Sequence, residues 1–206
     1  MARTQQQRRE DTIARLLDAS IATIIEFGYA RASAALIAKR AQLSDGAIFR
    51  HFPTMRDLMA ATLREAGRRQ LDLFADRIAQ IPAGAPSLDA VLPIIRDLTA
   101  NPTNAVIHEL WVAARTDETL RHTLRDAMTG YATEVLKTAR STPSAEEIAA
   151  VGGEESFAVL VSILLNTFDG AAMVGYVMPQ PEIQQRQVPV LMSLLNAAGD
   201  RAGANI

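Results

Sequence analysis

The side chains that could perform catalysis or bind a metal are few and widely separated in this sequence. The 206 residues include no cysteine, which excludes disulfides, thiolate metal sites and cysteine nucleophiles. The three histidines, His51, His108 and His122, are scattered along the chain. His108-Glu109 begins like a zinc-protease helix, but Val112 occupies the position of the second histidine ligand. Because a phosphate-binding loop, a GxGxxG motif and a nucleophile elbow are also missing, we expect no enzyme activity, no metal site and no cofactor.

Charged side chains are divided unevenly along the chain. Residues 1–70 hold twelve Lys and Arg against seven Asp and Glu, a net charge of +5, whereas residues 71–206 carry −7. This asymmetry favours contact between the amino-terminal part and a polyanion such as nucleic acid, with a chance distribution of solvated faces as the alternative. Arg3, Arg8 and Arg9 form either a disordered tail or an arm that touches a minor groove.

Residues 33–52 have the proportions of a helix-turn-helix. We expect a short helix over about 33–40, a tight turn at Gln42-Leu43-Ser44 with Ser44 as a helix cap, and a second helix that ends before Pro53. The second helix begins with Asp45-Gly46-Ala47, small or polar residues that let a backbone approach base edges in the major groove. Any helical hairpin with a short loop has a similar pattern, so the motif is not unique to DNA-binding proteins.

The elements around this motif also have helical periodicity. An apolar stripe precedes Gly28 and comprises Ile13, Leu16, Leu17, Ile21, Ile24 and Ile25. Thr54 with Asp57 predicts a capping box that opens a helix to about Ile81, and Ser144 with Glu147 predicts another before a short helical turn. Further helices are expected over 87–100, 103–115, 117–140, 154–178 and 182–198.

The sequence offers no segment that we expect to enter a membrane. Met1–Arg9 contains no apolar stretch of the signal-peptide type. The longest apolar run, Phe157–Leu165, is shorter than the roughly 20 residues that a membrane span requires. We therefore expect a soluble, cytoplasmic protein without a membrane partner.

The run from Gly28 to Pro53, followed by Leu58, resembles the N-terminal domain of the TetR family of transcriptional regulators. The matching residues are Gly28-Tyr29-Ala30-Arg31-Ala32-Ser33, Ile37-Ala38 and Ala41-Gln42-Leu43-Ser44-Asp45-Gly46-Ala47-Ile48-Phe49-Arg50-His51-Phe52-Pro53. The resemblance implies an all-α fold with a three-helix, helix-turn-helix DNA-binding domain over 9–69 and a helical effector-binding and dimerisation domain over 70–206. It also implies two-fold dimers whose recognition helices enter operator half-sites about 34–36 Å, or a multiple of this, apart.

The resemblance assigns DNA-contacting roles position by position. Ser33 would donate to a phosphate with its hydroxyl and its backbone N–H, Arg50 and His51 would contact the groove or phosphates, and Ala47 would pack on a thymine methyl. The full set is Ser33, Ser44, Asp45, Gly46, Ala47, Phe49, Arg50, His51 and Arg56. Asp45 has two interpretations, contact with a cytosine amine or stabilisation of the helix N-terminus, and Phe49 is either a base reader or partly structural.

Four positions depart from the family pattern. Phe49 stands where the family usually has tyrosine, and Met55 where it usually has lysine, so that Arg56 is left to supply the cation. Ala32 replaces the usual threonine. Gln42 replaces the usual turn glycine, which predicts a strained residue with positive φ.

The C-terminal part contains candidates for a pocket that binds a partly apolar small-molecule effector, as the resemblance implies. They are Phe74, His108, Trp111, Met128, Tyr131, Phe168, Met173 and Tyr176, with Asn166 and Asp169 as polar options. Aromatic and methionine side chains at helical spacing are also typical of an ordinary core, and that alternative stays open.

Two apolar helices near the carboxyl end predict a homodimer. Helices 154–178 and 182–198 would pair with their symmetry mates in a four-helix bundle, unless they serve only as intrachain core. We therefore interpret the chain as a ligand-responsive DNA-binding transcriptional regulator, a repressor that a small molecule releases from a double-stranded operator. The alternative is a helical small-molecule-binding or scaffold protein without DNA binding.

Overall fold

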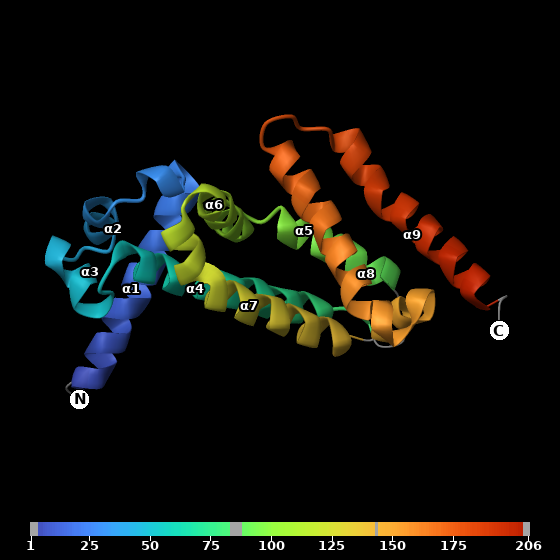
Figure 1. Ribbon diagram of the computed structural model, residues 1–206, viewed down its shortest axis with the longest axis horizontal. Helices are drawn as coiled ribbons and strands as arrows, with labels where there is room; N and C mark the ends of the chain where they lie inside the picture. The colour runs from blue at the N-terminus through green and yellow to red at the C-terminus, as the bar shows by residue number, and fades with distance from the viewer. Residues whose placement is uncertain (1–3, 83–87, 143, 204–206) are drawn as a thin grey trace. The chain divides into compact units, whose positions relative to one another are not determined.

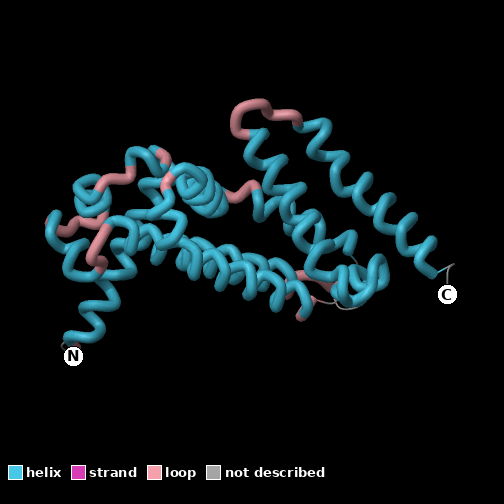
Figure 2. Tube along the Cα trace, in the orientation of Figure 1, coloured by secondary structure: helices cyan, strands magenta, loops and turns pink. Residues whose placement is uncertain are grey.

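The chain forms helices joined by short turns. The computed structural model describes residues 4–82, 88–142 and 144–203, and these residues contain no strand, which confirms the expected all-α class (Figure 1, Figure 2). Their helices are α1 (Gln5–Phe27), the 3₁₀ turn η1 (Tyr29–Arg31), α2 (Ala34–Arg40), α3 (Asp45–His51), α4 (Met55–Ile78), α5 (Leu88–Thr99), α6 (Pro102–Thr116), α7 (Glu118–Arg140), α8 (Ala145–Gly175) and α9 (Pro181–Gly203).

Contacts divide the chain into two units. The first comprises Met1–Arg69 and Pro102–Tyr131, and the second comprises Gln70–Asn101 and Ala132–Ile206. The helices α4 and α7 therefore each contribute residues to both units. The first unit includes α6 and the beginning of α7, which the sequence analysis assigned to the C-terminal domain.

The core of the first unit gathers around α1. In the apolar stripe of α1, Leu16, Ile21 and Ile24 are buried, whereas Ile25 is 43% exposed. The helices α2 and α6 pack against α1, and α3 packs against α2. Ile37 of α2 and Ile48 of α3 are fully buried in this cluster, so the helix-turn-helix is fixed to α1 through its apolar side chains.

Several helix ends follow the expected capping chemistry and others do not. The Thr54–Asp57 box is confirmed, since Thr54 N donates to Asp57 Oδ2 (2.9 Å) and Asp57 N donates to Thr54 Oγ1 (3.2 Å). The Ser144–Glu147 box is wrong: the Ser144 side chain caps nothing, and the Glu147 carboxylate accepts a hydrogen bond from Leu88 N instead. Glu147 therefore supplies a hydrogen-bond acceptor for the backbone N–H of Leu88, the first residue of α5.

Arg8 and Arg9 do not lie in a disordered tail, which was one of their two expected arrangements. A capping box between Thr4 and Gln7 starts α1 at Gln5, so Arg8 and Arg9 are helical. Arg3 lies outside the described residues.

The second unit is built on α5, α8 and α9. A non-helical residue, Gly153 (φ 75°, ψ 173°), kinks α8 and separates the short turn after Ser144 from the long helix, as predicted. The helices α8 and α9 lie side by side (Figure 1) and bury Phe157, Phe168 and Val188 between themselves and α5.

The apolar segment of α8 is longer than the expected run Phe157–Leu165. By length and composition alone, Gly153–Gly175 could cross a membrane, although core helices of soluble proteins pass the same test. The charged residues between Gly153 and Gly175 are Glu154, Glu155 and Asp169, and apolar residues continue past Leu165 on both sides of Asp169.

Candidate DNA-binding site

The turn between α2 and α3 has a geometry that glycine would favour. Gln42 has φ 55°, the left-handed conformation predicted for this position. Its N–H donates to Lys39 O (3.1 Å), and Leu43 N donates to Ala38 O (2.9 Å), the two hydrogen bonds of a Schellman motif. Arg15 of α1 donates to the carbonyl oxygens of Ala41 and Gln42. The turn is therefore held by both its own backbone and α1.

The exposed side of α3 carries three of the predicted DNA contacts. Gly46 and Arg50 are exposed, and Phe49 is 51% exposed although it is a large apolar side chain. Ala47 is only 8% exposed, so little of its surface is open to a thymine methyl, and its contact with DNA stays a prediction. The side chain of Asp45 lies outside the described part of the structure. Among the described side chains, α3 thus presents an aromatic ring and a guanidinium to solvent.

The serines at the two helix starts behave differently. Ser33 Oγ accepts a hydrogen bond from Leu36 N (3.3 Å) and retains its hydroxyl proton for a phosphate. The Ser33 N–H already donates to Arg31 O (2.9 Å), which corrects the expectation that it would bind the phosphate too. Ser44 stands at the N-cap of α3 and is exposed, but its side chain makes no capping hydrogen bond.

His51 and Arg56 flank this surface. His51 is partly buried, and its Nδ1 has no hydrogen-bond partner among the described residues. The Arg56 side chain is 45% exposed, and its Nη2 lies 3.7 Å from Oδ2 of Asp117 at the start of α7. Asp117 also accepts a hydrogen bond from Leu120 N (2.9 Å), so a phosphate would compete with a helix-capping carboxylate for Arg56.

Glu109 of α6 fixes the segment that leads into α2. Its Oε2 accepts a hydrogen bond from Tyr29 N (2.9 Å) and lies 3.3 Å from the place where a Cβ on Gly28 would be. Gly28 has φ 77°, so this close approach and this conformation both favour glycine. Burial and the nearby Asp117 carboxylate raise the pKa of the Tyr29 hydroxyl above its ordinary value.

A cluster of charged side chains joins α1 to α4 in the first unit. Arg68 donates twice to the Glu65 carboxylate (2.8 and 2.9 Å), Arg69 donates to it at 2.7 Å, and Arg69 also pairs with Asp18 of α1. Hydrogen bonding from Arg68, with a smaller contribution from Arg69, lowers the pKa of Glu65 to about 2.

The eight predicted effector residues are divided between the two units. His108, Trp111, Met128 and Tyr131 lie in the first unit, and Phe74, Phe168, Met173 and Tyr176 lie in the second. The rings of His108 and Trp111 are 5.7 Å apart, and Trp111, Met128 and Tyr131 pack against the first unit's core. A Cβ on Gly67 would lie 2.6 Å from Cδ2 of Tyr131, so this ring fills the space beside Gly67.

The other four residues differ in exposure. Phe168 is buried, Phe74 is partly buried, and Met173 and Tyr176 are 41% and 59% exposed. Phe168 alone of the eight lines the cavity that the structure describes within the second unit. Their joint role as an effector pocket stays a prediction.

Comparison with known proteins identifies the class of the helix-turn-helix. Residues 16–62 match the family model described as bacterial regulatory proteins, tetR family. A helix-turn-helix-type transcriptional regulator of Mycobacterium bovis is 56% identical over 197 residues, which are 96% of this chain and 99% of that protein. The chain belongs to the TetR family of transcriptional regulators. This TetR-family chain thus falls in a class of regulators rather than in a class of enzymes.

Solved TetR-type structures share the fold over nearly the whole chain. A TetR-family regulator from a Rhodococcus species has a TM-score of 0.72 at 15% identity, covering 90% of this chain and 98% of its own. A transcriptional regulator from Saccharomonospora viridis, solved in complex with choline, has a TM-score of 0.65 at 16% identity, covering 89% and 96%. These likenesses extend the TetR architecture beyond the residues of the family model.

Sequence reasoning missed several residues that support or surround these sites. Glu109 and Asp117 act on the helix-turn-helix from α6 and the start of α7, and no local pattern points to such distant partners. Arg96 and Gln187 line the second unit's cavity. The cluster Gln184-Gln185-Arg186-Gln187 is an available signal for Gln187, because several amides close together suggest a polar function, but no local pattern points to Arg96.

Proposed function

We propose that this TetR-family regulator is a cytoplasmic homodimeric repressor that a small molecule releases from its operator. The observation that carries the DNA-binding part is the exposed face of α3, where Phe49 is half exposed and Arg50 is exposed while Ile48 is fully buried. A short helix with one apolar face anchored in a core and the opposite face open is suited to the major groove. Arg50 supplies a guanidinium for a guanine edge or a phosphate, and Phe49 supplies an apolar edge for thymine methyl groups.

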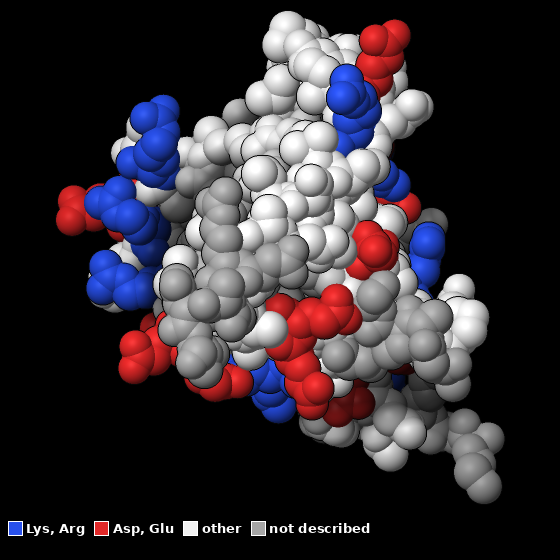
Figure 3. Space-filling view, turned by 90° about the vertical axis from the view of Figure 1, so that its right-hand side faces the viewer, with Lys and Arg blue, Asp and Glu red and all other residues white. Residues whose placement is uncertain are grey.

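Dimerisation is supported by an uncovered apolar face on the α8–α9 pair. Val159, Ile163 and Val174 recur along one side of α8 and are 57%, 52% and 51% exposed, and Val177, in the turn after α8, is 89% exposed. Ile183, Val190 and Leu194 recur along α9 with at least half of each side chain exposed. In Figure 3, which faces the side where α9 lies in Figure 1, uncharged side chains cover much of the centre.

A second copy is the occupant that suits this face. The opposite side of α8 is occupied by Phe157 and Phe168, so only one face needs a cover, whereas a bilayer would surround the helix. Gly170 lies within the exposed stripe, and a Cβ added there would meet nothing within 4 Å, which leaves room for a close helix partner. Four helices from two copies would bury the stripe.

The ligand response is supported by the relative that was solved with choline, and by a cavity in the second unit. Effector binding would favour a state whose two recognition helices no longer match the half-site spacing. Operator and effector must then weaken each other's binding by the same factor. Equal effector affinity for the free and the DNA-bound protein would contradict this mechanism.

Retention on duplex DNA from beside the protein's own gene tests the DNA-binding proposal. We expect affinity that falls steeply as salt rises, because phosphate contacts release counterions. Replacing Arg50 by Ala should weaken specific binding about tenfold to a hundredfold while the helical content by circular dichroism is unchanged. Arg64→Ala is the matched control. It removes an exposed arginine from the middle of α4 and should bind the operator as the wild type does.

Two results of this experiment would count against the proposal. Unchanged operator affinity for Arg50→Ala would show that α3 does not dock as described. A wild-type protein without retention at low salt would instead be the helical ligand-binding or scaffold protein.

A further inference from the structure

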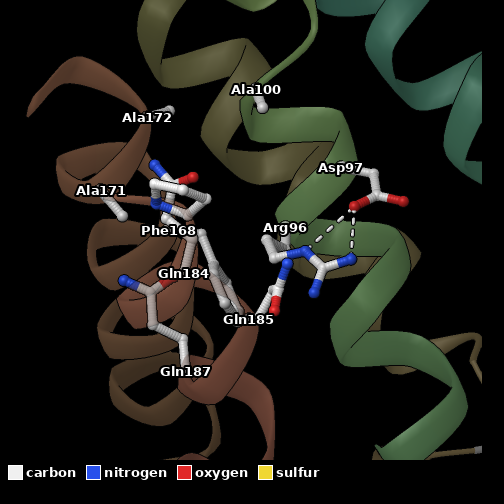
Figure 4. A pocket seen from close by; sticks show the side chains of 10 residues that line it. Arg96, Asp97, Ala100, Phe168, Ala171, Ala172, Gln184, Gln185 and Gln187 are labelled. Atoms are coloured by element: carbon white, nitrogen blue, oxygen red, sulfur yellow. Dashed lines mark hydrogen bonds and ion pairs between the residues drawn. The ribbon is translucent and has the colours of Figure 1, made fainter. Parts of the chain in front are cut away.

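A cavity of about 310 Å³ lies among α5, α8 and the first turns of α9 in the second unit. Figure 4 shows three glutamine side chains of α9 opposite Arg96 of α5. Phe168, which is buried, contributes an aromatic wall from α8, and Ala171 and Ala172 leave space because their side chains end at Cβ. The volume is at the lower end of the roughly 300–1,000 Å³ that small-molecule pockets have.

The described lining of this cavity has no net charge. Arg96 and Asp97 are its charged residues, and they neutralise each other: Arg96 Nε and Nη2 donate to Asp97 Oδ1 at 3.0 and 2.8 Å (Figure 4). An ionic ligand would have to leave water without an unpaired counter-charge. The cavity therefore favours an uncharged ligand.

The lining does have an unmet hydrogen-bonding capacity. Gln187 Oε1 is enclosed by the protein and has no hydrogen-bond partner among the described residues. A buried amide oxygen without a donor is costly, and a ligand that supplies an N–H or O–H removes this cost. The Gln184 side chain lies close to Gly175: its Nε2 is 2.8 Å from the place where a Cβ on Gly175 would be. Glycine at that position leaves the room that the Gln184 amide occupies.

We infer that this cavity binds a small uncharged molecule with one apolar face and an N–H or O–H donor. The donor satisfies Gln187 after a small rotation of its amide, and the apolar face packs against Phe168 and the two alanines. The inference specifies the ligand class of the proposed ligand response and rests on that proposal for its regulatory consequence. Nothing in the binding itself requires DNA.

Four simple aromatic probes distinguish the ligand class in the full-length protein. Phenol is uncharged and donates a hydrogen bond, toluene lacks the donor, and benzoate and benzylammonium carry opposite charges. We expect titrations followed by saturation-transfer NMR to show phenol binding about fivefold more tightly than toluene, and both charged probes binding more weakly than phenol. Equal affinity for phenol and toluene, or tighter binding of either ion, would overturn the inference.

Two variants then locate the binding. Gln187→Leu should reduce phenol affinity about fivefold to the level of toluene while toluene binding persists, which also shows that the variant is folded. Ala172→Leu should fill the cavity and remove the binding of both probes. Gln80→Leu, the same change at an exposed residue after α4, should alter neither affinity. Unchanged phenol binding by both cavity variants would place the probe elsewhere.

DNA retention of the same preparations separates this inference from the proposed function. If the protein prefers phenol over toluene but is not retained on DNA, the proposed regulatory function is refuted and the inferred ligand class is not. DNA retention without phenol selectivity would refute the ligand class alone.

Discussion

At the scale of single residues, the DNA-binding surface depends on which side of α3 each residue occupies. Ala47 and Phe49 are two positions apart, yet one is 8% exposed and the other 51% exposed. Position in a motif therefore does not guarantee contact with DNA, since packing against α2 decides which side chains remain free. The same local packing forces Gln42 into the left-handed region.

Replacing Gln42 by Gly should stabilise the protein. A residue with a Cβ pays about 1 kcal/mol or more in this conformation, whereas glycine adopts it freely. We expect urea denaturation to show a free energy of unfolding for Gln42→Gly that is higher by roughly 1 kcal/mol. Gln42→Ala keeps the Cβ and should show no such gain, and equal stability of the two variants would contradict the strain argument.

At the scale of elements, the helix-turn-helix is held from several directions. Arg15 of α1 caps the turn, Glu109 of α6 binds the segment before α2, and the cluster of Glu65, Arg69 and Asp18 joins α4 to α1. Arg15 and Glu109 come from two different helices, so the position of the helix-turn-helix depends on α1 and α6 as well as on its own turn.

The Glu65 cluster should make stability depend on acidic pH. Its pKa of about 2 in the folded chain lies below the ordinary value of 4.5. The ionised carboxylate therefore contributes stability that is present above about pH 4.5 and is lost as the pH falls toward 2. We expect Glu65→Gln to lower the free energy of unfolding at pH 7 and to reduce its change between pH 5 and pH 2.

Urea titrations at several pH values would measure this effect. Glu155→Gln removes an exposed glutamate from α8 and should leave the acidic slope unchanged. A Glu65→Gln protein with the wild-type slope would show that the Arg68 and Arg69 contacts do not stabilise the carboxylate.

At the scale of the whole molecule, the uncovered apolar face on α8 and α9 determines the proposed assembly. Val159→Glu would place two carboxylates near the dyad of each dimer, so we expect dissociation at concentrations where the wild type is dimeric. Val112→Glu is a matched control, because Val112 is 51% exposed on α6 and Val159 is 57% exposed on α8. Sedimentation velocity would measure both, and equal dissociation by both variants would contradict the α8–α9 interface.

The sequence by itself determined the helical class, the helix-turn-helix and the family resemblance, because these depend on local patterns. Apolar periodicity, the Thr54–Asp57 cap and the positive φ of Gln42 are all short-range properties of the chain. Only the tertiary structure decided that Ala47 is buried, that Glu147 serves α5 and that Glu109 reaches Tyr29 across 80 positions. It likewise divided the eight effector candidates between two units. These outcomes depend on which helices pack together, and the free energy of that packing is shared among residues that no local window contains.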